Sequence, residues 1–168
     1  PNYKTNVQDY ESFIDGHADT IDWQRFDENT ACTLCYTSGT TGDPKGVLYS
    51  HRSTILHAMA GSFKDVIGAG SSDVILAVVP MFHVSAWGLV YSAAMVGAKL
   101  VMPGPGLDGA NMVKMINQES VTLMAGVPTV WLGIYNYSKE HGIDLPTVKK
   151  ALVGGSALPE SLLRAFEQ

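Results

Sequence analysis

Short apolar runs of strand length alternate with helically spaced apolar residues from position 31 to the end of the sequence. The runs predict strands at residues 33–37, 74–79, 99–102, 121–125 and 150–153. The segments between them repeat apolar residues every three or four positions, which predicts helices. Each connection is long enough for a crossover between parallel strands. The pattern therefore predicts a three-layer α/β/α sandwich with a mostly parallel sheet.

Several residues mark where the expected helices begin. Ser50 and Asp108 are of the type that caps a helix N-terminus, and Pro128 and Pro159 are expected in a first helical turn. Residues 74–98 contain no Asp, Glu, Lys or Arg and are long enough to suggest a membrane span. Polar residues and Pro80 interrupt this stretch, so we expect a buried strand and a buried helix over residues 84–98 instead, with no membrane span.

The first 30 residues differ in charge from the rest. They carry seven acidic and two basic side chains, which accounts for the whole formal net charge of −5. We therefore expect an acidic lead-in segment at 1–30, held by its aromatic rings, and an α/β subdomain at 31–168. The sequence opens without Met and stops inside an amphipathic stretch, so we expect a piece of a longer chain, truncated at its C-terminus.

Composition narrows the choice of partners and compartment. Charged residues make up 16% of the sequence, compared with about 25% in a typical soluble domain. We therefore expect part of the surface to face the remainder of a parent chain. The acidic balance argues against nucleic acid as a partner. Cys32 and Cys35, three apart on a strand, point to opposite faces, which predicts buried thiols, no metal site and a reducing cytoplasm.

The segment at residues 36–47, YTSGTTGDPKGV, has the composition of a loop that holds phosphate. Glycine lets the backbone approach a ligand closely, hydroxyl groups add hydrogen-bond donors, and Lys45 adds a mobile positive charge. The spacing does not match the P-loop of NTPases. A flexible linker is the alternative, but the Asp-Pro-Lys-Gly end and the expected place between a buried strand and an amphipathic helix favour a phosphate-binding loop.

This segment resembles the phosphate-binding signature of the adenylate-forming superfamily, which includes acyl-CoA synthetases, luciferases and the adenylation domains of peptide synthetases. Four further segments, at 80–88, 96–105, 122–131 and 152–162, follow in the order seen in medium- and long-chain fatty acyl-CoA synthetases. The resemblance implies an ATP-dependent, AMP-forming ligase that uses Mg²⁺ and coenzyme A. It also implies that Thr41 and Lys45 are catalytic. The loop residues that it assigns to the β- and γ-phosphates are Thr37, Ser38, Gly39, Thr40, Thr41, Gly42 and Lys45.

The other matching segments imply residues for the substrate and the nucleotide. A lone histidine in an apolar run is typical of a protein core, but the resemblance places His83 beside the reacting carboxylate and implies that it is catalytic and binds the substrate. Trp87, four residues later, is expected on the same helical face, either as a wall of the acyl site or as core packing. Two further groups of residues either contact a ligand or only form an ordinary helix start and turn. The resemblance implies that the first group binds the substrate: Gly126, Val127, Pro128 and Thr129. It implies that the second group borders the adenine and the acyl chain: Gly154, Gly155, Ser156 and Ala157.

Three functional residues that members of the superfamily carry nearer their C-terminus are absent from this sequence. They are a magnesium-binding Glu, a ribose-binding Asp and the adenylation Lys, so residues 1–168 alone are expected to be inactive and to hold no metal site. The expected substrate of the parent is a carboxylic acid, preferably a fatty acid. Two alternatives stay open: an adenylation domain for an aryl or amino acid, and a non-catalytic nucleotide-binding or interaction module. A homo-oligomer is compatible with the sequence.

Overall fold

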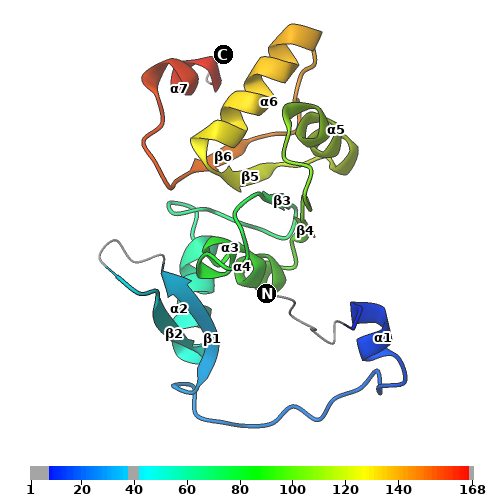
Figure 1. Ribbon diagram of the computed structural model, residues 1–168, viewed down its shortest axis with the longest axis vertical. Helices are drawn as coiled ribbons and strands as arrows, with labels where there is room; N and C mark the ends of the chain where they lie inside the picture. The colour runs from blue at the N-terminus through cyan, green and yellow to red at the C-terminus, as the bar shows by residue number, and fades with distance from the viewer. Residues whose placement is uncertain (1–7, 38–41, 167–168) are drawn as a thin grey trace.

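A computed structural model describes residues 8–37 and 42–166. Helices and strands alternate along most of the chain (Figure 1). The elements are α1 (Tyr10–Ile14), β1 (Ala31–Thr37), β2 (Lys45–Ser50), α2 (His51–Ser62), β3 (Val74–Ala77), α3 (Val84–Trp87), α4 (Leu89–Val96), β4 (Lys99–Val101), α5 (Gly109–Glu119), β5 (Leu123–Gly126), α6 (Pro128–His141), β6 (Lys150–Val153) and α7 (Glu160–Phe166).

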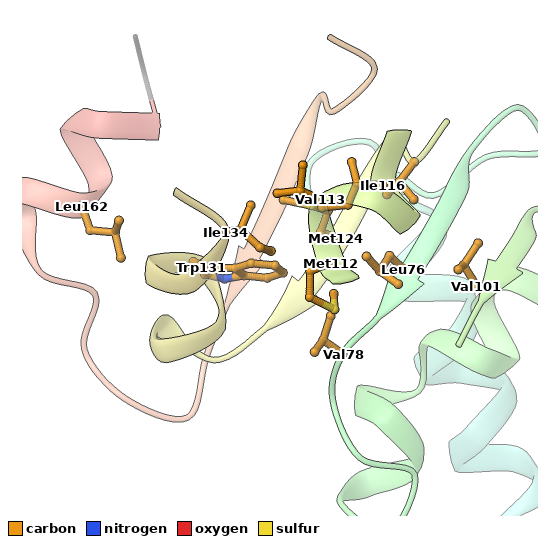
Figure 2. Close-up of a cluster of buried hydrophobic side chains, with 11 residues drawn as sticks. Leu76, Val78, Val101, Met112, Val113, Ile116, Met124, Trp131, Ile134 and Leu162 are labelled. Atoms are coloured by element: carbon orange, nitrogen blue, oxygen red, sulfur yellow. The ribbon is translucent and has the colours of Figure 1, made fainter. Parts of the chain in front are cut away.

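A four-stranded parallel sheet lies at the centre, with the strand order β4-β3-β5-β6. Helices α5 and α6 cover one face of the sheet, and α3 and α4 lie on the opposite side (Figure 1). Figure 2 shows the core on the α5–α6 side, where Met112, Met124 and Trp131 meet. The core on the other side contains Ile75 and Leu89. The predicted three-layer sandwich with a parallel sheet is confirmed.

The first predicted strand does not belong to this sheet. β1 pairs antiparallel with β2 as a separate two-stranded hairpin, so the glycine-rich segment connects two strands. The prediction that this segment lies between a buried strand and a helix was wrong in both respects, because β1 buries only Cys35 and β2 comes before α2. The apolar run Val47–Leu48–Tyr49 after a Gly-containing turn is the pattern of a hairpin. Cys32 is exposed rather than buried, and both thiols are free.

Most of the expected helix starts are confirmed. The Ser50 hydroxyl accepts a hydrogen bond from the Ser53 amide at 3.1 Å, and the Asp108 carboxylate accepts one from the Asn111 amide at 3.0 Å. Pro128 is the first residue of α6. Pro159 stands one residue before α7 rather than inside its first turn. Local capping chemistry therefore positions α2, α5 and α6.

The expected helix over residues 84–98 is broken near its start. Val84, Ser85, Ala86 and Trp87 all have positive φ, between 50° and 55°, and Gly88 follows at 71°. These are left-handed values, which cost an ordinary residue roughly 1–2 kcal/mol each. The right-handed helix α4 begins only after Gly88. Residues 84–87 therefore form a left-handed turn that reorients the chain between β3 and α4.

The lead-in segment contacts the rest of the chain where it approaches α2. The ring of Phe26 packs on His51 with 4.5 Å between centroids, and Glu28 pairs with Arg52. Trp23, by contrast, is 82% exposed, so this ring does not hold the segment as expected. Among the residues that the structure describes, no helix combines the length and the apolar character needed to cross a membrane.

Candidate functional site

The mouth of the β1–β2 hairpin holds the two ends of the glycine-rich segment side by side. Thr37 and Lys45 are register partners, and the Thr37 hydroxyl donates a hydrogen bond to the Lys45 carbonyl oxygen at 3.5 Å. Both residues are exposed, as is Gly42. The hairpin therefore fixes where Lys45 stands relative to the start of the loop. Four of the predicted phosphate ligands lie outside the described residues: Ser38, Gly39, Thr40 and Thr41.

A hollow of about 300 Å³ opens beside this mouth, and we name it the carboxylate hollow. Thr37 and Tyr49 line it from the hairpin, and His83 and Val84 line it from the segment after β3. His83 is exposed, so it is not a histidine of the core. The hollow thus brings together Thr37, the first residue of the predicted phosphate loop, and His83, although the two are 46 positions apart in the sequence.

Between His83 and Trp87 the chain forms a left-handed turn in place of the expected right-handed helix, and the Trp87 amide donates to the His83 carbonyl oxygen at 3.5 Å. The Trp87 ring lies against Gly154, where a Cβ would stand 2.6 Å from the ring. Any larger residue at position 154 would displace the indole. The absence of a side chain at 154 is therefore a packing requirement of Trp87.

The two predicted groups at the carboxyl ends of β5 and β6 meet each other. The Gly154 amide donates to the Gly126 carbonyl oxygen at 3.3 Å. A Cβ at Gly155, where φ is +82°, would lie 3.2 Å from a methyl group of Val127. The carboxyl ends of parallel strands are where α/β sheets bind ligands. Trp87, Val127 and the two glycines therefore form one surface at the expected edge of the sheet.

Other residues of these groups serve packing or face solvent. Gly126 is buried, and a Cβ there would stand 3.1 Å from the Trp131 ring. Pro128 is also buried, at the start of α6. Thr129, Ser156 and Ala157 are exposed. The structure thus gives Gly126 and Pro128 a packing role, which leaves Val127 and Thr129 as the exposed members of their group.

A second hollow, which the sequence did not predict, lies between the hairpin, α2 and the left-handed turn. Its volume is about 210 Å³, and we name it the tail hollow. The signal in the sequence was weak: Ser53 and His57 lie four apart and share one face of α2. The hollow is lined by Thr33, Tyr49, Ser53, Thr54, His57, Val84, Ser85, Gly88 and Tyr91.

A parallel sheet with glycines at the carboxyl end of β6 is typical of α/β proteins that bind a ligand at that edge. The chain belongs to the AMP-binding enzyme family, which matches residues 3–168. This finding agrees with the resemblance seen in the motifs.

Curated relatives and a solved structure extend the comparison. The medium-chain-fatty-acid–CoA ligase of Ectopseudomonas oleovorans is 54% identical over 157 residues, 94% of this chain and 29% of the relative. The 3-methylmercaptopropionyl-CoA ligase of Ruegeria lacuscaerulensis is 49% identical over 159 residues, 95% of this chain and 30% of the relative. An anthranilate CoA ligase in complex with anthranoyl-AMP matches 98% of this chain at a TM-score of 0.84 and 25% identity, over 32% of its own length. The chain thus spans less than a third of each.

Proposed function

We propose that this chain is part of an ATP-dependent, AMP-forming acyl-CoA ligase that acts on a fatty acid. The observation that carries the proposal is the carboxylate hollow, where Thr37 at the start of the glycine-rich loop and His83 line one space. A carboxylate bound at this hollow would lie next to the phosphates that the loop holds. Family membership and the two acyl-CoA ligases among the relatives support the same reading.

The proposed reaction has two steps. A carboxylate oxygen attacks the α-phosphorus of ATP, the bond to pyrophosphate breaks, and an acyl-adenylate forms. The thiol of coenzyme A then attacks the acyl carbonyl carbon and loses its proton, and AMP leaves with the electrons of the acyl–oxygen bond. Both steps develop negative charge on oxygen atoms, so preorganised donors contribute most to the rate. We assign that role at the phosphates to Lys45 and the loop residues from Thr37 to Gly42.

The lining of the two hollows supports an apolar acid. Among the residues that the structure describes, no Asp or Glu lines either hollow. An amino acid substrate needs a partner for its ammonium group, because an unpaired charge is costly to bury. Val127 and Trp87 add apolar surface beside the glycines of the β6 end. A fatty or similarly apolar acid is therefore the substrate class that we propose.

The proposed reaction also needs Mg²⁺ and residues from the rest of the parent chain. Magnesium is usually bound by one or two carboxylates together with substrate phosphates. In the part of the chain that the structure describes, no group of three or more His, Cys, Asp or Glu side chains could hold a metal ion. We therefore derive no step through Mg²⁺ and expect it to arrive with ATP. The proposal includes a parent chain in the cytoplasm, whose further residues complete the site.

The test is pyrophosphate release by the full-length parent protein. The assay contains ATP, Mg²⁺ and one acid from a panel of saturated fatty acids, 3-methylmercaptopropionate, an aryl acid and amino acids. We expect release with the fatty acids, and thioester formation once coenzyme A is added. A preference for amino or aryl acids would overturn the substrate class, and no release with any acid would overturn the function. Residues 1–168 alone are predicted to produce no thioester in the same assay.

A further inference from the structure

The β1–β2 hairpin has two faces, because successive residues of a strand point to opposite sides. One face borders the two hollows and includes Thr37 at the hairpin mouth. The other face, which we name the outer face, carries two register pairs: Leu34 with Leu48, and Tyr36 with Gly46. Tyr36 and Gly46 belong to the glycine-rich motif, but the proposed function gives neither of them a role.

Gly46 leaves a gap on the outer face, and two neighbouring side chains fill it. A Cβ at this position would stand 3.1 Å from Cδ1 of Leu34 and 3.5 Å from Cε1 of the Tyr36 ring. The φ of Gly46 is not positive, so the backbone itself does not require glycine here. A glycine inside a strand weakens it, because it has no side chain to pack, and a neighbouring aromatic ring can compensate for this loss. The Tyr36 ring therefore supplies the packing that Gly46 lacks.

The pair of Tyr36 and Gly46 stands directly before the phosphate loop. The next pair along the hairpin is Thr37 with Lys45, which closes the mouth. The hydrogen bond from the Thr37 hydroxyl to the Lys45 carbonyl oxygen is 3.5 Å long, beyond the usual range of about 2.5–3.0 Å, so it adds little support. The Tyr36 ring on Gly46 is thus the last apolar cross-strand contact before the loop begins. A loop whose ends are already held loses less conformational freedom when it binds a ligand.

We propose that Tyr36 is a positioning residue for ATP, whose ring holds the register of the hairpin mouth and thereby the place of Lys45 relative to Thr37. This inference rests on the proposed function, because it assumes that the loop holds the phosphates of ATP. Tyr36 acts through Lys45 and does not touch the nucleotide. Tyr36 also borders the carboxylate hollow, so the experiment must separate positioning of the loop from contact with the acid.

The experiment compares tyrosine variants of the full-length protein. Tyr36→Ala removes the ring and Tyr36→Phe keeps it without the hydroxyl, while Tyr10→Ala, which changes an exposed tyrosine of α1, is the matched control. The dissociation constant of the fluorescent nucleotide TNP-ATP measures binding without turnover. Pyrophosphate release gives kcat and the KM values for ATP and for a saturated fatty acid. Thermal melting shows whether each variant is folded, as we expect for a side chain that is 62% exposed.

The expected result is weaker binding of the nucleotide and unchanged binding of the acid. Tyr36→Ala should raise the dissociation constant of TNP-ATP and the KM for ATP by about 1.5- to 5-fold, because a cross-strand pair contributes about 0.2–1 kcal/mol. The KM for the fatty acid should stay constant, and Tyr36→Phe and Tyr10→Ala should both resemble wild type. The effect of Tyr36→Ala should be smaller in a Gly46→Ala background, because the new methyl group fills part of the gap beside the ring.

Three results would overturn the inference. Unchanged nucleotide binding in a folded Tyr36→Ala protein would show that the ring does not position the loop. A higher KM for the acid, or an equal loss of nucleotide binding in Tyr36→Phe, would show that Tyr36 contacts a ligand directly. An equal effect of Tyr36→Ala in the Gly46 and Gly46→Ala proteins would show that the ring does not act through Gly46.

The two readouts separate this inference from the proposed function. If the wild-type protein binds TNP-ATP but releases no pyrophosphate with any acid, the proposed function fails, and the dissociation constants still decide the role of Tyr36. If the wild-type protein releases pyrophosphate and Tyr36→Ala behaves like wild type, only the inference fails. If the wild-type protein binds no TNP-ATP, the inference fails as well, because there is no nucleotide for the loop to hold.

Discussion

The parallel sheet and the β1–β2 hairpin differ in where their apolar side chains lie. Leu76, Leu123 and Met124 on the sheet are fully buried between two helical layers. On the hairpin, Leu34 is 50% exposed and Leu48 is 67% exposed. The two central strands of the sheet, β3 and β5, are covered on both faces, whereas a two-stranded hairpin has little stability of its own. The sheet therefore carries the stability of the described fold, and the hairpin carries Thr37 and Lys45, to which we assign a role in the proposed reaction.

This difference separates two kinds of substitution. Changes in the helix–sheet core should alter the free energy of unfolding, and changes at the hairpin should alter adenylation with little effect on unfolding. A residue that joins the two regions should affect both. The following changes test this division, beginning with the largest expected effect.

Trp131→Ala should destabilise the protein by about 3–5 kcal/mol, the usual cost of removing a buried aromatic side chain. The indole is 0% exposed in the core between α5, α6 and the sheet. Among the described residues its Nε1 has no hydrogen-bond partner, so the loss is one of packing. Denaturant unfolding of the full-length protein measures it. Leu132→Ala, next to it on α6 and 47% exposed, is the control, and equal effects would contradict the assignment.

Lys45→Ala should reduce ATP-dependent adenylation by about 10- to 150-fold, because a hydrogen bond to a charged group contributes about 1.5–3 kcal/mol. Lys45 is exposed at the start of β2, so the melting temperature should stay unchanged. Pyrophosphate release with saturating fatty acid gives the rate. Lys114→Ala, an exposed lysine of α5, should leave the rate as it is. Normal kinetics in a folded Lys45→Ala protein would remove this residue from the site.

Gly154→Ala should destabilise the protein by about 1–3 kcal/mol, because the new methyl group would overlap the Trp87 ring. The same substitution in a Trp87→Ala background should cost much less, since the overlapping ring is gone. A double-mutant cycle on the melting temperatures measures this coupling. Additive effects of the two substitutions would show that the contact does not join the left-handed turn to the end of β6.

Asp108→Asn should have the smallest effect, and one that depends on pH. The backbone hydrogen bond from Asn111, followed by one from the Asn111 side chain, lowers the pKa of Asp108 from its ordinary value of 3.8. A lowered pKa in the folded state stabilises the protein above the unfolded pKa, and the contribution is lost as the pH falls through the folded value. The difference in melting temperature from wild type should therefore be present at neutral pH and shrink in acid. A constant difference would contradict the prediction.

The sequence predicted the buried part of the fold better than the exposed part. Strands at Val74–Ala77 and Leu123–Gly126 were foreseen because uncharged runs between helical segments are typical of buried parallel strands. β2 was missed because its residues were assigned to the glycine-rich motif and to the helix that follows. Short apolar runs near a loop do not reveal which strand they pair with.

The candidate site shows the same division between local and long-range information. Motifs singled out His83, Trp87 and Gly154, but periodicity placed the first two on one helical face. Only the fold shows that His83 lies near Thr37 and that Trp87 lies on Gly154. The motifs did not predict the tail hollow, because the residues that line it come from three separate segments of the chain.

The left-handed turn at residues 84–87 is a point of local frustration. Each residue there adopts a backbone conformation that its own side chain disfavours, most of all the β-branched Val84. Glycine would relieve that conflict but would also remove the side chains that face the two hollows and Gly154. Sequences are usually consistent from local preference to global fold, and exceptions collect at functional positions. Directed evolution for stability alone should therefore select glycine or asparagine at Val84 and Ser85, at the expense of the side chains that line the two hollows.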